Sequence, residues 1–155
     1  MLNLSAWLTE ESIQTDLNAS TSVAVLHELV GLALKRAPNL DPNVLVDSLS
    51  RRERLRSTAV LEGVAFPMAE VEELNEPIIC IGCSRDGVHF GSLDDLPTQL
   101  FIVLLTPTSD SHTSLRIVAR LTRLFQSNPK LTLRLLECSE PQRLLELFLQ
   151  YEATI

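Results

Sequence analysis

The amino-acid sequence predicts an α/β sandwich. Two continuous apolar runs, at residues 78–83 and 100–105, are typical of strands that are buried on both faces of a sheet. Segments with apolar residues at helical spacing precede and follow these runs, and strands interleaved with helices pack as a sheet covered by helical layers. The chain has 155 residues, of which 45% are hydrophobic and 21% are charged. We therefore expect residues 1–155 to form a single domain.

The first part of the chain carries several start signals for regular structure. A short helical turn at residues 4–8 leads to an extended piece at 13–17, where apolar and polar residues alternate. Hydroxyl side chains at 20–22 can cap a helix that ends before Pro38, and we expect His27 to be exposed on it. The predicted apolar stripe of this helix consists of Val23, Leu26, Leu29, Val30, Ala33 and Leu34.

A second helix begins with Asp41 as N-cap and Pro42 as the first helical residue. Its predicted apolar face consists of Val44, Leu45, Leu49 and Leu55. Residues 59–66 then predict a buried strand that is interrupted at Gly63, and the strand stops at Pro67, which has no amide hydrogen to donate. Met68 accordingly falls at a strand end, where binding residues commonly gather in α/β sheets.

The second half continues the alternation of strands and helices. Residues 85–87 predict a turn after the strand at 78–83, and the run at 100–105 is expected in the centre of the sheet. Residues 109–111 can cap a helix, a shorter helix follows at 128–136, and a capping box at 139–142 opens the last helix. The predicted apolar residues of the helix after 111 are Leu115, Val118, Ala119, Leu121, Thr122 and Phe125.

Charge and composition exclude several functions. The net charge of −7 disfavours nucleic acid as a partner, because such binding depends on clustered cations. The basic residues form one cluster, Arg51, Arg52, Arg54 and Arg56, and Arg51, Arg54 and Arg56 are better explained as the end of a helix, where cations stabilise the dipole. The N-terminus lacks the pattern of a secretory signal, and no apolar run is long enough to insert into a membrane. We therefore expect a cytoplasmic domain.

Two residue groups resemble chemical sites only superficially. Cys80 and Cys83 match the C-x-x-C spacing, but residues three apart on a strand point to opposite faces, so we expect no shared metal and no cofactor. With Cys138 there are three cysteines, which fits a reducing compartment. Asp94 and Asp95 are adjacent in a loop, where their side chains diverge, so they do not indicate a hydrolase.

The most informative motif lies at residues 52–68. Arg52-Glu53 is followed by Ser57-Thr58 and then by Gly63-Val64-Ala65-Phe66-Pro67-Met68. This pattern resembles the signature of the fructose/mannitol-type IIA domains of the bacterial phosphotransferase system, roughly R-E-x-x-x-[ST]-T-x-x-x-x-G-[IV]-A-[IFV]-P-H. The sequence departs from the signature at its last position, where the family has its phosphoacceptor histidine and this chain has Met68.

The resemblance extends over nearly the whole chain. Residues 86–107 are similar to a second family block, in which a G-[IV]-x-[FW] turn precedes a strand that ends in proline. A third family block is a helix that begins H-L-x-x-L-x-x-[LV]-A. When Leu115, Val118 and Ala119 are aligned with its apolar positions, Ser111 takes the place of the second active-site histidine, and His112 is one residue further on.

The resemblance implies a mixed five-stranded sheet flanked by helices, in the three-layer-like sandwich of the phosphotransferase/anion transport protein type. In active members the phosphorylated carrier HPr delivers phosphate to the signature histidine, and the domain passes it to a IIB domain or uses it as a regulatory signal. An imidazole nitrogen is nucleophilic near neutral pH, whereas a thioether has only a weak lone pair and no proton to exchange. We therefore do not expect Met68 to carry phosphate.

Our leading hypothesis is a phosphorylation-incompetent IIA-like domain that acts as a regulatory or protein-binding module, with an HPr-like carrier or a transporter domain as partner. The predicted binding residues are Arg52, Thr58, Met68, Ser111 and His112. Arg52 either pairs with a phosphoryl group or forms an ion pair with an acidic neighbour, and Met68 either fills the vacated site or contacts a partner. Two alternatives remain open: a phosphocarrier that uses His112, and a small-ligand sensor in the vacated site.

Overall fold

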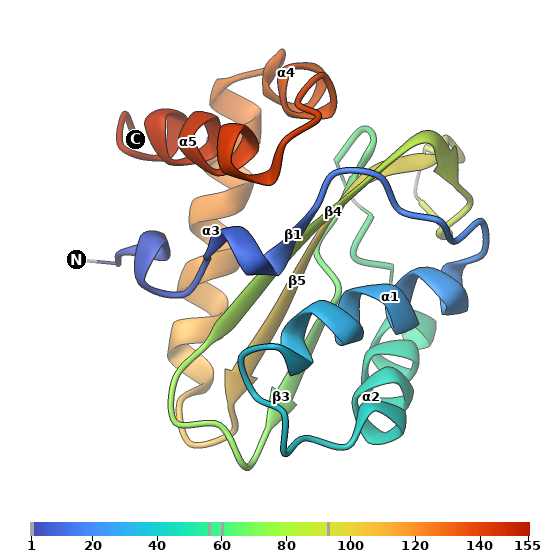
Figure 1. Cartoon of the computed structure of the whole chain (residues 1–155), viewed down its shortest axis with the longest axis vertical. Helices are drawn as coiled ribbons and strands as arrows, with labels where there is room; N and C mark the ends of the chain where they lie inside the picture. Colours follow the sequence, from blue (N-terminus) through green and yellow to red (C-terminus); the bar gives the residue numbers. More distant parts are fainter. Residues whose placement is uncertain (1, 56, 60, 93) are drawn as a thin grey trace.

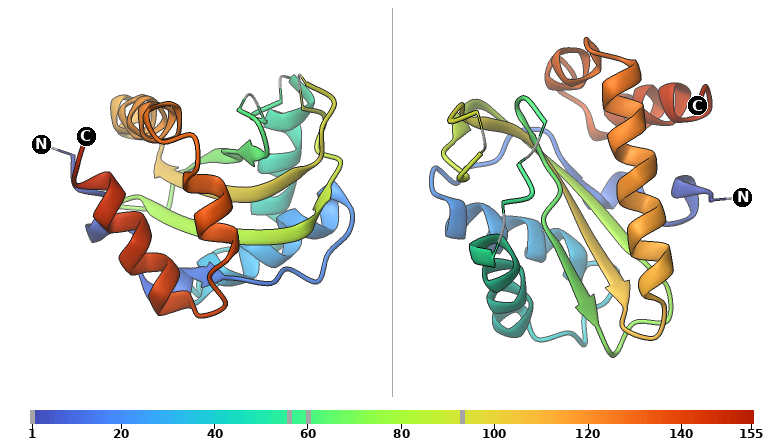
Figure 2. Two further views of the ribbon diagram at one scale, coloured as in Figure 1. Left: turned by 90° about the horizontal axis from the view of Figure 1, so that it is seen from above. Right: turned by 180° about the vertical axis from the view of Figure 1, so that it is seen from behind.

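A mixed five-stranded sheet lies between two layers of helices, which confirms the predicted fold class. The computed structural model describes residues 2–55, 57–59, 61–92 and 94–155. Helix α1 crosses the front of the sheet in Figure 1, and α3 covers its back, as the view from behind in Figure 2 shows. The elements are η1 (Leu4–Ala6), η2 (Glu10–Ser12), β1 (Ile13–Gln14), α1 (Ser22–Leu34), α2 (Pro42–Leu55), β2 (Val64–Ala65), β3 (Met68–Val71), β4 (Ile78–Val88), β5 (Thr98–Pro107), α3 (Ser111–Ser127), α4 (Leu131–Leu136) and α5 (Pro141–Glu152).

Strand β5 is the centre of the sheet, as its continuous apolar sequence predicts. It pairs antiparallel with β4 along one edge and parallel with both β2 and β3 along the other. The short β1 is parallel to β4 and closes the sheet on that side. Every residue of the run 100–105 is fully buried, so the strand contributes apolar side chains to the core on both faces.

Helices α1 and α2 pack on one face of the sheet, and their start signals are confirmed. The Thr21 hydroxyl accepts a hydrogen bond from the Ala24 amide, and the Asp41 carboxylate accepts one from the Asn43 amide at 2.9 Å. The predicted apolar faces are only partly right. Val23 is half exposed, Val44 is 58% exposed and Leu55 is 85% exposed. Leu26, Leu29, Val30, Ala33, Leu45 and Leu49 are buried as predicted, and the stripes also include Val25, Leu32 and Val46, which the prediction left out.

Helices α3, α4 and α5 pack on the opposite face. The buried stripe of α3 consists of Ile117, Leu121, Leu124 and Phe125. Leu115 and Ala119, which we predicted on the apolar side, are exposed, and Leu115 is 69% exposed. The prediction followed the hydrophobic residues of the first turns, whereas the buried side is set by the i, i+4, i+7 series that begins at Ile117. The side of α3 that packs on the sheet is therefore rotated about the helix axis relative to the predicted side.

Three further details of the predicted secondary structure are wrong. The strand expected at 59–66 is confined to β2, the turn expected at 85–87 lies within the irregular end of β4, and no capping-box hydrogen bond forms at Glu140. The register of β4 against β5 shifts between Cys83 and Val88, so residues 84–87 form an irregularity in the strand and not a turn that ends it. Arg56 of the predicted basic cluster and Val60 of the predicted strand lie outside the described residues.

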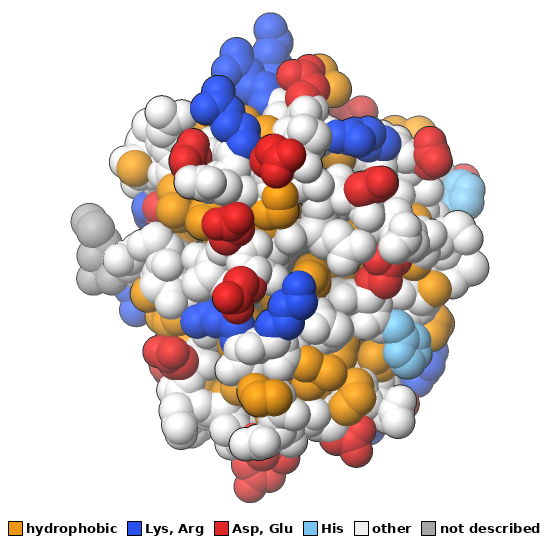
Figure 3. All heavy atoms as spheres, viewed as in Figure 1, with side chains coloured by type: hydrophobic (Ala, Val, Ile, Leu, Met, Phe, Trp, Pro, Cys, Tyr) orange, Lys and Arg blue, Asp and Glu red, His pale blue; other side chains and the backbone are white. Residues whose placement is uncertain are grey.

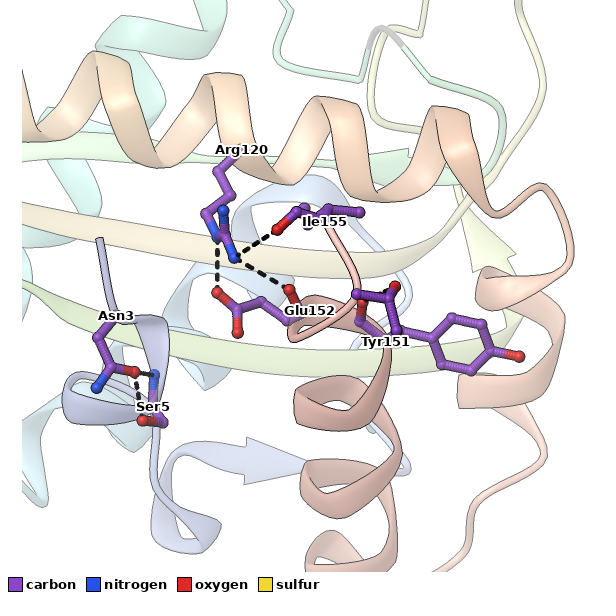
Figure 4. Close-up of polar contacts among 7 residues, drawn as sticks. Asn3, Ser5, Arg120, Tyr151, Glu152 and Ile155 are labelled. Carbon is purple, nitrogen blue, oxygen red and sulfur yellow. Dashed lines mark hydrogen bonds and ion pairs between the residues drawn. The ribbon is translucent and has the colours of Figure 1, made fainter. Parts of the chain in front are cut away.

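A buried ion pair fastens the last helix to α3. Arg120 donates from Nε to the Glu152 carboxylate at 2.6 Å and from Nη2 to the Glu152 carbonyl at 3.0 Å, as Figure 4 shows. Both side chains are largely buried, at 21% and 10% exposed, so the pair is shielded from water and salt.

No helix within residues 2–55, 57–59, 61–92 and 94–155 combines the length and hydrophobicity that crossing a bilayer requires.

The orientation of α3 can be tested with two leucines on its opposite sides. Leu121→Ala should lower the free energy of unfolding by about 2–5 kcal/mol, because Leu121 is fully buried and its truncation leaves a cavity. Leu115→Ala, the matched control on the exposed side, should change it by less than about 0.5 kcal/mol. Urea denaturation of both variants measures the difference. Equal losses would show that Leu115 is also part of the core.

Candidate functional site

A pocket of about 280 Å³ forms where α2, β3 and the start of α3 meet. Two of the predicted binding residues, Arg52 and Met68, lie together in its wall. The other lining residues are Ser48 from α2, Ala69 and Glu70 from β3, and Ser114 from α3. The pocket therefore combines a cation, a thioether, two hydroxyls and a carboxylate.

Met68 reaches this pocket because of an unexpected strand. Residue 68 does not end a strand, as the sequence suggests, but opens β3, with Met68 opposite Leu104 in a parallel register. Pro67 cannot donate to the ladder, but its carbonyl accepts the Leu104 amide at 2.8 Å, so the chain continues along the same edge of β5. The Met68 side chain is half-buried and packs against the core on the α3 side.

Glu53 and Thr58 form a clamp at the end of α2. The Glu53 carboxylate accepts hydrogen bonds from the Thr58 amide at 3.1 Å and from the Thr58 hydroxyl. Ser57 extends the clamp by donating its hydroxyl to the Phe90 carbonyl at 3.2 Å. Thr58 is only 5% exposed. Its place in the structure is a buried support for the loop, outside the described lining of the Met68 pocket.

Burial dominates the electrostatics of Glu53. Loss of solvent raises the pKa of this carboxyl above its ordinary value of 4.5, although the hydrogen bonds from Thr58 and the nearby Arg52 guanidinium act in the opposite direction. Arg52 therefore has the Glu53 carboxyl close enough to influence its charge, and Glu70 lines the same pocket as Arg52.

The start of α3 presents Ser114 rather than the residues we predicted. Ser111 and His112 are both exposed, and neither is among the described residues that line the Met68 pocket. His112 lies about 200° around the helix axis from Ser114, since each residue turns the helix by about 100°. The signal that identifies Ser114 is the buried series Ile117, Leu121, Leu124, which extends back by one turn to residue 114.

The C-x-x-C cysteines behave as the strand geometry predicts. Cys80 packs into the core on the α1 side of β4, and Cys83 packs into the core on the α3 side. Burial raises the pKa of each thiol to about 12. Among the described residues, no group of three or more His, Cys, Asp or Glu is placed to hold a metal ion. Cys138 is partly exposed, in the loop between α4 and α5.

Comparison with known proteins gives consistent results. A family model described as "Phosphoenolpyruvate-dependent sugar phosphotransferase system, EIIA 2" matches residues 6–151. The fructose-specific EIIABC component of Bacillus subtilis (strain 168) is 25% identical over 151 residues, which are 97% of this chain. The alignment covers 24% of that protein, so this chain spans about a quarter of its length.

Solved structures share the fold. Nitrogen regulatory protein IIA-Ntr from Neisseria meningitidis superposes with a TM-score of 0.85 at 23% identity, over 93% of this chain and 97% of that one. Enzyme IIA for mannitol from Escherichia coli, in its complex with phosphorylated enzyme IIB, superposes with a TM-score of 0.74 at 20% identity, over 96% of this chain and 98% of that one. At these identities the likeness concerns the arrangement of the elements.

Because the pKa of Glu53 is raised in the folded protein, we expect the stability of the fold to depend on pH. A carboxyl whose pKa is higher in the folded state stabilises the fold while protonated, so its contribution is complete below 4.5 and is lost as the pH rises through the folded-state pKa. Wild type should therefore lose stability relative to Glu53→Gln as the pH rises from about 4 to about 8. Denaturation of both proteins across this range measures the difference. A difference that changes in the opposite direction would contradict the role of burial.

The three thiols should react in a fixed order. At neutral pH, iodoacetamide should modify Cys138 in the folded protein, whereas Cys80 and Cys83 should stay unmodified until the protein unfolds, because both are inaccessible and almost entirely protonated. Peptide mass mapping before and after denaturation reports the order. A Cys138→Ser variant should show no modification when folded. Modification of Cys80 or Cys83 in the folded protein would show that the sheet opens readily.

Proposed function

Because this chain belongs to the family of phosphotransferase-system EIIA type 2 domains, we propose that residues 1–155 are one such domain, that it has lost the ability to accept a phosphoryl group, and that it acts by binding a protein partner. The observation that carries this proposal is the position of Met68, between Arg52 and Ser114 in a pocket formed by three elements. The side chain at the last position of the signature therefore lines a pocket, and a phosphoacceptor would have to occupy this same position.

The chemistry of the pocket supports a lost acceptor. Phosphoryl transfer to a side chain needs a nucleophilic nitrogen or oxygen, whereas a thioether sulfur has only a weak lone pair and no proton to exchange. The two hydroxyls of the pocket, on Ser48 and Ser114, have no imidazole among the described lining residues to activate them. Ser111, which the resemblance aligns with the second family histidine, is exposed, and the described α3 residue in the pocket wall is Ser114. Arg52 retains a group suited to pairing with an oxyanion.

The surroundings of the pocket support a protein partner. Large apolar side chains are exposed on the helices that supply its walls: Val44 and Leu55 on α2, at 58% and 85% exposed, and Leu115 on α3, at 69%. Apolar side chains around a cationic centre are typical of the middle of a protein interface. Two of the related proteins suggest the class of partner, since one contains A, B and C components in a single chain and the other is solved bound to enzyme IIB. We therefore propose a carrier or transporter component in the cytoplasm as the partner.

Incubation with phosphoenolpyruvate and the HPr-dependent carrier chain tests the loss directly. The mass of the wild-type protein should not change, because no described residue of the pocket can form a phosphoramidate. Met68→His should gain one acid-labile phosphate at residue 68, since Arg52 still lines the site. Met68→Gln, which has a polar side chain but no nucleophilic ring nitrogen, is the matched control and should remain unmodified.

The same experiment separates this proposal from its alternative. A gain of phosphate in the wild-type protein that disappears in His112→Ala would show that the domain is a phosphocarrier with a relocated acceptor. The exposed position of His112, outside the described lining of the pocket, favours the opposite result. If Met68→His also stays unmodified, the site has changed in more positions than residue 68.

A further inference from the structure

A second cavity lies between α4 and α5, at the opposite end of the molecule from β3 (Figure 1). Its volume is about 590 Å³, which is within the range of small-molecule sites. Three cationic side chains line it, Lys130 and Arg134 from the α4 segment and Arg143 from the first turn of α5. The apolar part of the lining is supplied by Leu133 and Leu147.

The charge of this cavity contrasts with that of the whole chain. The protein has a net charge of −7, yet Lys and Arg side chains gather at the α4–α5 end, as Figure 3 shows. Two carboxylates in the lining, Glu137 and Glu140, offset part of the positive charge. Arg143 approaches Glu146 only to 3.9 Å, and both side chains are mostly exposed, so this weak pair does not prevent the guanidinium from turning to a ligand.

The framework of the cavity is firmly attached to the core. Arg85 on β4 donates from Nε to the Leu136 carbonyl at the end of α4, at 3.1 Å, and Gln99 on β5 donates to the Arg85 carbonyl at 2.8 Å. Leu131 and Leu135 anchor α4, and Leu144 anchors α5, all of them fully buried. The two walls are therefore held apart before any ligand binds, which is usual for small-molecule sites.

We propose that the cavity between α4 and α5 binds a small organic oxyanion, a phosphate or carboxylate carried on an apolar body. Guanidinium groups pair with such oxyanions through two parallel hydrogen bonds, and Arg134 and Arg143 present two of these groups across one cavity. The exposed Leu133 and the neighbouring Leu147 provide a surface for the apolar body. Glu137 and Glu140 disfavour long polyanions such as nucleic acid. The inference is independent of the Met68 pocket and of the function proposed for it.

Cys138 provides a built-in reporter, because it lines the cavity and is the partly exposed thiol of the three. Phenyl phosphate, titrated into the wild-type protein, should slow the alkylation of Cys138 by iodoacetamide severalfold. Phenol has the same ring without the oxyanion and should leave the rate unchanged. The double variant Arg134→Gln/Arg143→Gln should lose the protection, whereas Arg51→Gln, which removes an exposed arginine on α2, should keep it.

Several results would overturn the inference. The first is an alkylation rate of the wild-type protein that millimolar phenyl phosphate leaves unchanged, and the second is equal protection of Cys138 by phenol. Equal protection of the wild type and the double variant would show that the two arginines do not bind the probe. Melting temperatures of all variants, measured without probe, distinguish lost binding from lost folding. A folded double variant without protection supports the oxyanion site.

Discussion

The pairing of β2 and β3 with the same edge of β5 determines where the Met68 pocket forms. Pro67 separates the two short strands, and because its carbonyl still accepts the Leu104 amide, the chain does not leave the sheet at the proline. Met68 is then held opposite Leu104 of β5, a strand that is buried from Leu100 to Pro107. A slip by one residue would turn every side chain of β3 to the other face, so burial of β5 fixes the direction of residue 68.

Several residues of the motif at 52–68 hold the backbone between α2 and β5 in place. Glu53 and Thr58 hold the loop after α2, and Gly63, with a φ of 73°, turns the chain into β2. The Gly63 carbonyl then accepts the amides of Gln99 and Leu100, both at 2.9 Å, which joins the loop to the start of β5. These residues therefore have structural roles that do not depend on the side chain at position 68.

The sequence predicts where helices and strands lie better than it predicts which side of a helix is buried. Strands β4 and β5, and the N-caps Thr21 and Asp41, follow from local signals that act within a few residues. The exposed sides of α2 and α3 could not be predicted in the same way, because Leu55 and Leu115 have the composition of core residues and only the packing against the sheet decides which side is buried. Among the described residues of α3, Ser114 lines the Met68 pocket, and this too depends on how the helix packs. Strand β3 could not be predicted because its pairing partner is distant in sequence.

Under the proposed function, a methionine at position 68 also suits the fold better than a histidine would. A half-buried imidazole must keep its nitrogens hydrated or hydrogen-bonded, and burial without partners costs free energy. Methionine removes that requirement, and its flexible thioether fills irregular space against the core on the α3 side. Functional residues often reduce stability in this manner, so a change that abolishes phosphoryl acceptance is expected to leave the domain at least as stable. The loss of phosphoryl acceptance that we propose therefore needs no stabilising change elsewhere in the domain, because the methionine is itself compatible with the core on the α3 side.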